Sequence, residues 1–116
     1  MKNKADISSL DDIKLLVNSF YTEVKKDDLL GPIFMERVHN WDTHLETMYK
    51  FWESILLDAY TYKGTPFAKH ADLPVNKTHF DRWVHLFGQI VDENFKGTIA
   101  ENAKSRAAQF GTLFWS

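Results

Sequence analysis

Residues 8–28, SSLDDIKLLVNSFYTEVKKDD, decide the fold class of this chain. Ser9, followed three residues later by Asp12, resembles a capping box, which marks the start of a helix. The apolar residues behind it recur in steps of three and one, so they keep to one helical face. They are Leu10, Ile13, Leu16, Val17, Phe20, Tyr21 and Val24. The spacing predicts a long amphipathic helix with the hydroxyl-bearing Tyr21 on its buried face.

Three further stretches, residues 40–60, 76–95 and 96–116, repeat their apolar residues with the period of a helix. The repeating residues are Leu45, Met48, Phe51, Trp52, Ile55 and Leu56 in the first, Phe80, Trp83, Val84, Phe87, Ile90, Val91 and Phe95 in the second, and Ile99, Ala103, Ala107, Phe110 and Phe114 in the third. Each has a candidate N-cap, namely Asn40 or Asp42 for the first, Asn76 for the second, and Thr98 with Glu101 for the third. No stretch alternates apolar and polar residues over the length of a strand. The sequence therefore predicts an all-α fold, with residues 1–116 as a single domain of four main helices.

Composition narrows the class of partner. The 14 basic and 16 acidic residues give a net charge of −2, which favours neither nucleic acid nor an anionic membrane as partner. The absence of cysteine excludes thiol chemistry, disulfides and iron–sulfur clusters. The first residues, MKNKADISS, have no apolar run after their lysines, and no apolar stretch is long enough to span a bilayer. We therefore expect a soluble, cytoplasmic protein.

Four side chains stand out because of where they lie in the predicted elements. Tyr21 and Trp83 lie in the middle of apolar stripes, and His44 lies one turn before its stripe. His70 lies in an irregular segment, PFAKHADLP, bracketed by two prolines. Taken singly, a buried Tyr or Trp most often bonds a backbone carbonyl, and a His at a helix start is most often exposed. Together, these donors on separate elements could converge on one buried polar group that the sequence does not supply.

Motifs for other chemistries are absent from the sequence. It has no HExxH pair for zinc, no nucleophile elbow and no glycine-rich phosphate loop. His79 and His85 are six residues apart, so they point to different sides of their helix. His85 shares its side with Asp81, Arg82 and Gln89, which indicates a solvated position.

Several short motifs follow one another along the chain. They are SFYTEV (19–24), LGPIF (30–34), WDTHL (41–45), FWESIL (51–56), YKGTPFAKHADLP (62–74) and HFDRWVHLF (79–87). With these motifs the chain resembles a group III truncated haemoglobin over nearly its whole length. The Gly-Gly pairs of groups I and II are missing. The resemblance implies a truncated globin fold, a two-over-two helical sandwich around haem b.

On this resemblance the proximal haem ligand falls on His70. A single axial imidazole suffices, because the porphyrin supplies the other four ligands of the iron. The same region offers candidate partners for the haem propionates, namely Lys69, Tyr62 and Lys63, although a solvated surface position is an equal alternative for Lys63.

The resemblance also implies which residues face the ligand. Tyr21, Trp83 and His44 match the family's side chains on the ligand-binding side of the iron. Phe34 matches the aromatic residue that packs on the porphyrin, and Met48, one turn after His44, should line the same cavity. A hydroxyl or indole donor stabilises bound O₂, so Tyr21 and Trp83 favour tight holding of O₂, or chemistry on it, over easy delivery.

Three functions remain open from the sequence. The first is a haem globin that binds O₂, and also NO or CO, at a pentacoordinate or weakly hexacoordinate iron. It would serve in oxygen transport, NO dioxygenation or peroxide chemistry, and turnover would need an external reductase because the sequence has no reductase domain. The second is a haem-based storage or sensing module without turnover. The third is a haem-free helical interaction protein. In each case we expect a monomer or a weak dimer.

Overall fold

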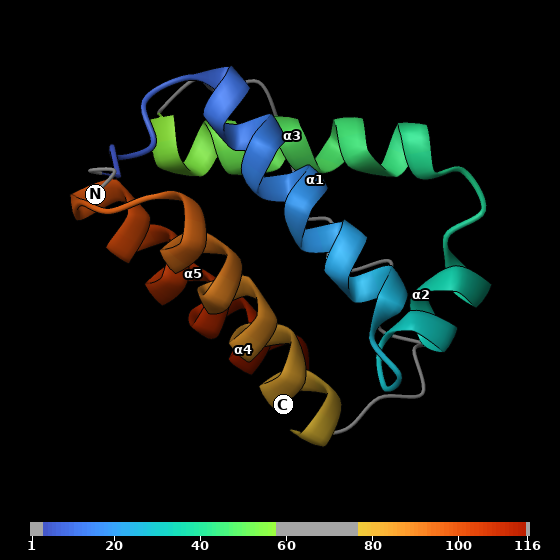
Figure 1. The fold of residues 1–116 in the computed structure, drawn as a ribbon. Helices are drawn as coiled ribbons and strands as arrows, with labels where there is room; N and C mark the ends of the chain where they lie inside the picture. The colour runs from blue at the N-terminus through green and yellow to red at the C-terminus, as the bar shows by residue number, and fades with distance from the viewer. Residues whose placement is uncertain (1–3, 58–76, 116) are drawn as a thin grey trace.

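The computed structural model of this protein describes residues 4–57 and 77–115, without the side chains of Arg37 and of residues 110–115. These residues form five helices and no strand (Figure 1). The helices are α1 (Leu10–Lys26), α2 (Gly31–Arg37), α3 (Trp41–Leu57), α4 (Lys77–Asn94) and α5 (Thr98–Trp115). The prediction of an all-α fold is confirmed.

The long helices pack as two pairs. Helix α1 crosses α3, and α4 and α5 run side by side in opposite directions (Figure 1). The pairs meet where α1 packs on α4 and α3 packs on α5, while the short α2 packs against α1. This arrangement is the expected two-over-two sandwich of a truncated globin. It brings the middles of α1 and α4, which carry Tyr21 and Trp83, into one core.

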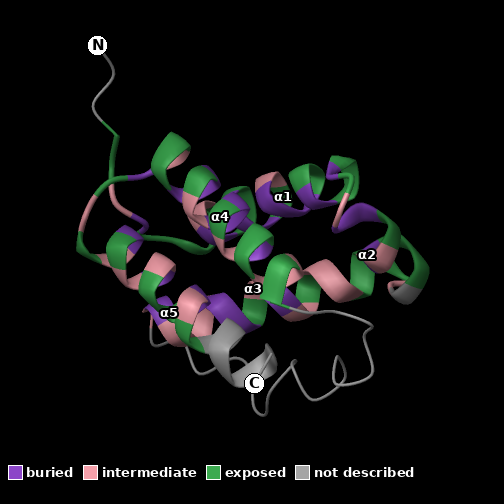
Figure 2. Cartoon of the chain, turned by 90° about the horizontal axis from the view of Figure 1, so that it is seen from below, coloured by how far each residue is buried: buried purple, intermediate pink, exposed green. Residues whose placement is uncertain are grey.

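The buried faces of the helices agree with most of the predicted stripes (Figure 2). In α1 every predicted core residue is buried except Leu10, which is 39% exposed. Leu86 in α4 and Ala100 in α5 are buried although they fall outside the predicted stripes. Both lie one residue from a predicted core position, because a helix that packs on two neighbours buries a wider face than a single stripe.

Two of the predicted caps are confirmed. The Ser9 side chain accepts from Asp12 N (3.3 Å), and Asn40 Oδ1 accepts from Thr43 N (3.1 Å). The Asn76 cap lies outside the described residues.

The predicted capping box of Thr98 and Glu101 is wrong. The start of α5 is capped by Asp6, whose carboxylate accepts from Ile99 N (2.9 Å) and Ala100 N (2.8 Å). A carboxylate at a helix N-terminus also meets the positive end of the helix dipole. The N-terminal segment is thereby fixed to the start of the last helix.

The turn between α1 and α2 depends on a close backbone approach. Gly31 packs against the end of α1, where a Cβ atom would lie 2.7 Å from the carbonyl oxygen of Lys25. Asp27 Oδ2 accepts from Leu29 N (3.0 Å) and Leu30 N (2.9 Å), which closes the turn. Glycine is therefore required for α2 to begin this close to α1.

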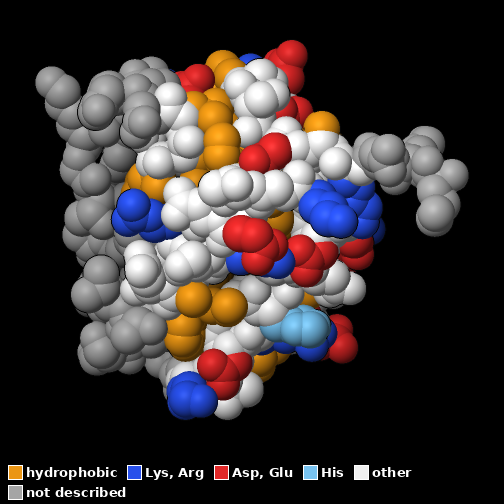
Figure 3. Space-filling model, turned by 90° about the vertical axis from the view of Figure 1, so that its left-hand side faces the viewer, with side chains coloured by type: hydrophobic (Ala, Val, Ile, Leu, Met, Phe, Trp, Pro, Cys, Tyr) orange, Lys and Arg blue, Asp and Glu red, His pale blue; other side chains and the backbone are white. Residues whose placement is uncertain are grey.

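Acidic and basic side chains are mixed over the surface, as the face in Figure 3 shows. Lys104, for example, pairs with both Asp92 (2.7 Å) and Glu101 (2.8 Å). Among the described residues, no helix has the length and apolarity needed to cross a membrane.

Candidate functional site

Tyr21 lies at the centre of the candidate site. It is in the C-terminal half of α1, is 4% exposed, and belongs to the main core. Its ring lies 5.1 Å from the ring of His44 on α3 and 6.1 Å from that of Phe34 on α2, both edge-to-face. Three elements therefore meet at Tyr21, and two of its neighbours are residues that the sequence had indicated.

Burial alone raises the pKa of the Tyr21 hydroxyl far above its usual value, because the phenolate would be desolvated. The hydroxyl is therefore neutral at every physiological pH. A neutral phenol keeps its proton and can act as a hydrogen-bond donor.

Trp83 reaches the same cluster through one intervening ring. It is 7% exposed on α4 and stacks on Phe87 at 5.8 Å. Phe20 lies edge-to-face with Trp83 at 5.5 Å and with Tyr21 at 5.0 Å. The structure thus joins Tyr21 and Trp83 in one aromatic cluster, with Phe20 between them.

The polar atoms of these two residues are hydrogen-bond donors in an apolar setting. Tyr21 is 4% exposed and Trp83 is 7% exposed, and burial is the cause that acts on the pKa of the Tyr21 hydroxyl. The structure therefore places two donors, a hydroxyl and an indole N–H, in one aromatic cluster.

The remaining predicted site residues on α2 and α3 border the same core. Phe34 is 7% exposed and Met48 is 2% exposed, and both belong to the main apolar cluster. His44 is half-buried, and its Nε2 atom is shielded from solvent. The predicted proximal ligand His70, and the propionate candidates Tyr62, Lys63 and Lys69, lie outside the described residues.

One residue beside this cluster was not foreseen. Trp41, the first residue of α3, lies 5.8 Å from the ring of Tyr21 and 5.7 Å from that of His44. Its position three residues before His44 places both on the same side of α3. That spacing was the available signal in the sequence.

An ion pair fixes α4 against the α1–α2 turn. Arg82 Nε lies 2.6 Å from Asp27 Oδ1, and the Asp27 side chain is 3% exposed. Burial raises the pKa of Asp27, but hydrogen bonds from Leu30 N, Arg82 and Leu29 N outweigh it, so the pKa lies below its ordinary value. Arg82 was expected to be solvated, and its side chain is indeed half-exposed while it reaches this buried carboxylate.

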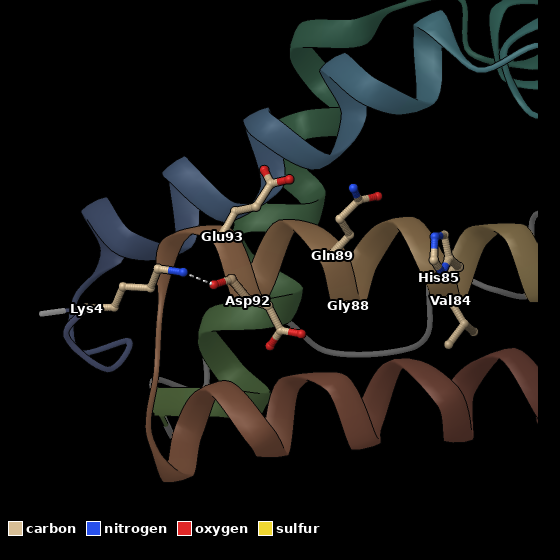
Figure 4. A pocket seen from close by; sticks show the side chains of 7 residues that line it. All are labelled: Lys4, Val84, His85, Gly88, Gln89, Asp92 and Glu93. Carbon is tan, nitrogen blue, oxygen red and sulfur yellow. Dashed lines mark hydrogen bonds between the residues drawn. The ribbon is translucent and has the colours of Figure 1, made fainter. Parts of the chain in front are cut away.

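His85 is placed away from the cluster. It is exposed, as predicted, and lines an open surface groove of about 620 Å³ along α4 (Figure 4). At one end of this groove Lys4 Nζ donates to the carbonyl oxygen of Asp92 (2.6 Å). The groove contains none of the residues around Tyr21, so the two regions are separate.

Comparison with known proteins identifies the family. The family model described as bacterial-like globin matches residues 6–112. The chain belongs to the bacterial-like globins. This globin is 31% identical over 121 residues to the group 3 truncated haemoglobin ctb of Campylobacter jejuni, covering 97% of this chain and 95% of that protein. The crystal structure of a group III truncated haemoglobin from Campylobacter jejuni superimposes with a TM-score of 0.86 at 29% identity, covering 97% and 92% of the two chains. The resemblance to group III that the motifs indicated is confirmed.

Membership of the globin family implies a haem cofactor. The described residues fit that group, because apolar and aromatic side chains suit the faces of a porphyrin. The hydroxyl of Tyr21 and the indole N–H of Trp83 suit a small iron-bound ligand that has a lone pair to accept a hydrogen bond. The apolar surface and the two donors both lie on elements α1, α2, α3 and α4.

Proposed function

We propose that this globin binds haem b with His70 as its only proximal protein ligand, and binds O₂, NO or CO on the side of Tyr21 and Trp83. The observation that carries the proposal is the pair of donor-bearing side chains, Tyr21 and Trp83, buried in one aromatic cluster through Phe20. Haem supplies the iron at which a diatomic molecule binds, and the residues of the chain decide how long it stays. The shared core of all five helices supports residues 1–116 acting as one globin domain.

Tyr21 and Trp83 act as donors to the bound ligand. Both keep their proton near neutral pH, since the pKa of Tyr21 is raised and an indole N–H only donates. A hydrogen bond to a partly charged acceptor contributes about 1.5–3 kcal/mol. At about 1.4 kcal/mol per factor of ten, each donor slows O₂ dissociation by roughly ten- to a hundredfold.

Phe34, Met48 and His44 shape the space around the ligand. The two apolar residues, both buried here, would pack against the cofactor and exclude water, which would strengthen the hydrogen bonds of the donors. His44 lies at the edge of this space, half-buried beside Tyr21, and controls ligand access.

Tight holding of O₂ favours chemistry on O₂ over its delivery. We therefore place NO dioxygenation or a peroxide reaction ahead of oxygen transport, and turnover would need electrons from an external reductase. Storage or sensing without turnover is the alternative. Turnover of NO or hydrogen peroxide in the presence of an electron donor separates the two, because a storage module binds these molecules without consuming them.

Absorption spectra of the purified protein in ferric, ferrous and CO-bound states test haem binding and its ligand. His70→Ala should strip haem from the protein or leave it loosely held. The matched variant is His79→Ala, in the first turn of α4, which should keep the wild-type CO-bound spectrum. The proximal assignment is wrong if His79→Ala loses haem while His70→Ala keeps a normal CO-bound spectrum.

Stopped-flow kinetics of O₂ and CO test the roles of the ligand-facing residues. Tyr21→Phe and Trp83→Phe should each raise the O₂ dissociation rate by about tenfold or more, equivalent to one lost hydrogen bond. His44→Leu should chiefly change the association rate. The roles are refuted if His44→Leu has the largest effect on O₂ dissociation while the other two variants leave it unchanged.

A further inference from the structure

Trp41 occupies the corner where the end of α1 meets the start of α3. Its ring is edge-to-face with His44 (5.7 Å, 87°) and with Tyr21 (5.8 Å, 64°). The rings of His44 and Tyr21 are themselves 5.1 Å apart at 83°. The three rings form a triangle in which each one contacts the other two.

A cation lies against one ring of this triangle. Lys25, in the last turn of α1, places its Nζ atom 4.1 Å from the centre of the Trp41 ring. This distance lies within the range of a cation–π contact, in which the ammonium is attracted to the negative face of the indole. Trp41 is only half-buried, so its own burial does not fix it as firmly as Tyr21 is fixed.

The geometry restricts how His44 can leave its position. Its Nε2 atom is shielded from solvent, although the residue as a whole is half-buried. Swinging the imidazole outward breaks its edge contacts with both Tyr21 and Trp41. The movement becomes easier when Trp41 shifts, and a shift of Trp41 in turn has to break its contact with Lys25.

We infer that Trp41 is a positioning residue that holds His44 against Tyr21, and that Lys25 fixes Trp41 in place through its cation–π contact. The inference rests on the proposed function for the role of His44 in ligand access, but not for the position of His44 itself. Opening of the ligand side is then controlled by a pair of residues that do not touch the ligand. Removing the cation should increase the open population by a factor of about two to five, the usual contribution of an exposed cation–π contact.

Acylation of histidine by diethyl pyrocarbonate, followed by peptide mass spectrometry, measures this directly. The rate at His44 is divided by the rate at His85 of the same molecule, which is exposed and serves as the internal reference. Lys25→Gln should raise the ratio by about two- to fivefold, and Trp41→Leu by at least as much. Lys25→Arg should restore the wild-type ratio, because a guanidinium makes the same contact.

The chain offers a matched control on the same two helices. Lys14 lies over the ring of Tyr49 at 5.7 Å, away from the triangle. Lys14→Gln makes the same change of charge and should leave the His44 ratio unchanged. The inference is overturned if His44 reacts equally in the wild type, Lys25→Gln and Trp41→Leu, or if Lys14→Gln accelerates it as much as Lys25→Gln.

Flash photolysis of the CO complex of the same variants extends the test to ligand access. Lys25→Gln should raise the CO association rate by the same factor of about two to five, and Lys14→Gln should not. An unchanged CO association rate in Lys25→Gln, with faster labelling of His44, would overturn the role in access. Failure of the proposed function would look different, because the wild type itself would then form no CO-bound haem spectrum.

Discussion

The contact between Asp27 and Arg82 gives the most specific prediction for stability. The Asp27 carboxylate accepts three hydrogen bonds, from Leu29 N (3.0 Å), Leu30 N (2.9 Å) and Arg82 Nε (2.6 Å). It joins the end of α1, the start of α2 and the first half of α4. These are the elements that carry Tyr21, Phe34 and Trp83.

The two partners should differ in how much their loss destabilises the fold. Asp27→Ala leaves Leu30 N buried without its acceptor, whereas water can reach the half-exposed Arg82. We expect a loss of about 2–4 kcal/mol, from one buried backbone donor left unpaired and from the lost hydrogen bonds to a charged acceptor. Arg82→Met leaves Asp27 with its two backbone donors, so the expected loss is about 1–2 kcal/mol. The total stability of such a domain is about 5–15 kcal/mol, so both losses are measurable.

The stabilisation that the Asp27 carboxylate contributes should depend on pH in a defined direction. The pKa of Asp27 in the folded protein lies below its ordinary value. The ionised carboxylate therefore contributes its stabilisation fully above the unfolded-state pKa of about 3.9, and loses it as the pH falls through the lowered pKa. The difference in the free energy of unfolding between the wild type and Asp27→Asn should accordingly be largest near neutral pH and shrink in strong acid.

Urea denaturation of the haem-loaded protein, followed by circular dichroism at pH 7 and at acid pH, measures these differences. The control is Asp28→Ala, the exposed neighbour of Asp27, which should change stability by less than about 0.5 kcal/mol. The reasoning is refuted if Arg82→Met is as costly as Asp27→Ala, or if Asp28→Ala matches either of them.

Four further outcomes follow from other parts of the molecule. Gly97→Ala should cost about 1–3 kcal/mol in urea denaturation, because Gly97 has φ +149° and a Cβ there would overlap the Asp6 carboxylate. Gly88→Ala, within α4 and with room for a Cβ, should instead stabilise by about 0.5–1 kcal/mol. In an alkaline ultraviolet titration Tyr21 should remain a phenol at about pH 11 while the protein is folded. Tyr21→Phe should therefore leave the absorbance change from tyrosinate formation up to that pH unchanged. Because unfolding releases that proton above about pH 10, stability should fall as the pH rises further. Removal of haem should lower the melting temperature well below that of the loaded protein, since Phe34, Met48 and Trp83 would lose packing partners, and equal melting temperatures would contradict their proposed contact with haem.

The sequence by itself determined the helices and most of their buried faces. The period of apolar residues is a local property, so it placed Tyr21 and Trp83 in the core without knowledge of their neighbours. The caps of Ser9 and Asn40 were also predictable, because each side chain bonds a backbone group three residues away. The globin resemblance depends on short motifs of the same local kind.

Only the tertiary structure decided which side chains meet. Asp6 caps the start of α5 through Ile99, which lies 93 residues later in the sequence. Arg82 pairs with Asp27, from which it is separated by 55 positions. Phe20 joins Tyr21 to Trp83, and Lys25 covers Trp41, because α1 crosses both α3 and α4. Periodicity shows which face of a helix is buried, but the residue opposite it depends on the angle and register at which two helices cross. That geometry results from the packing of all the side chains in the core together, so no single segment contains it.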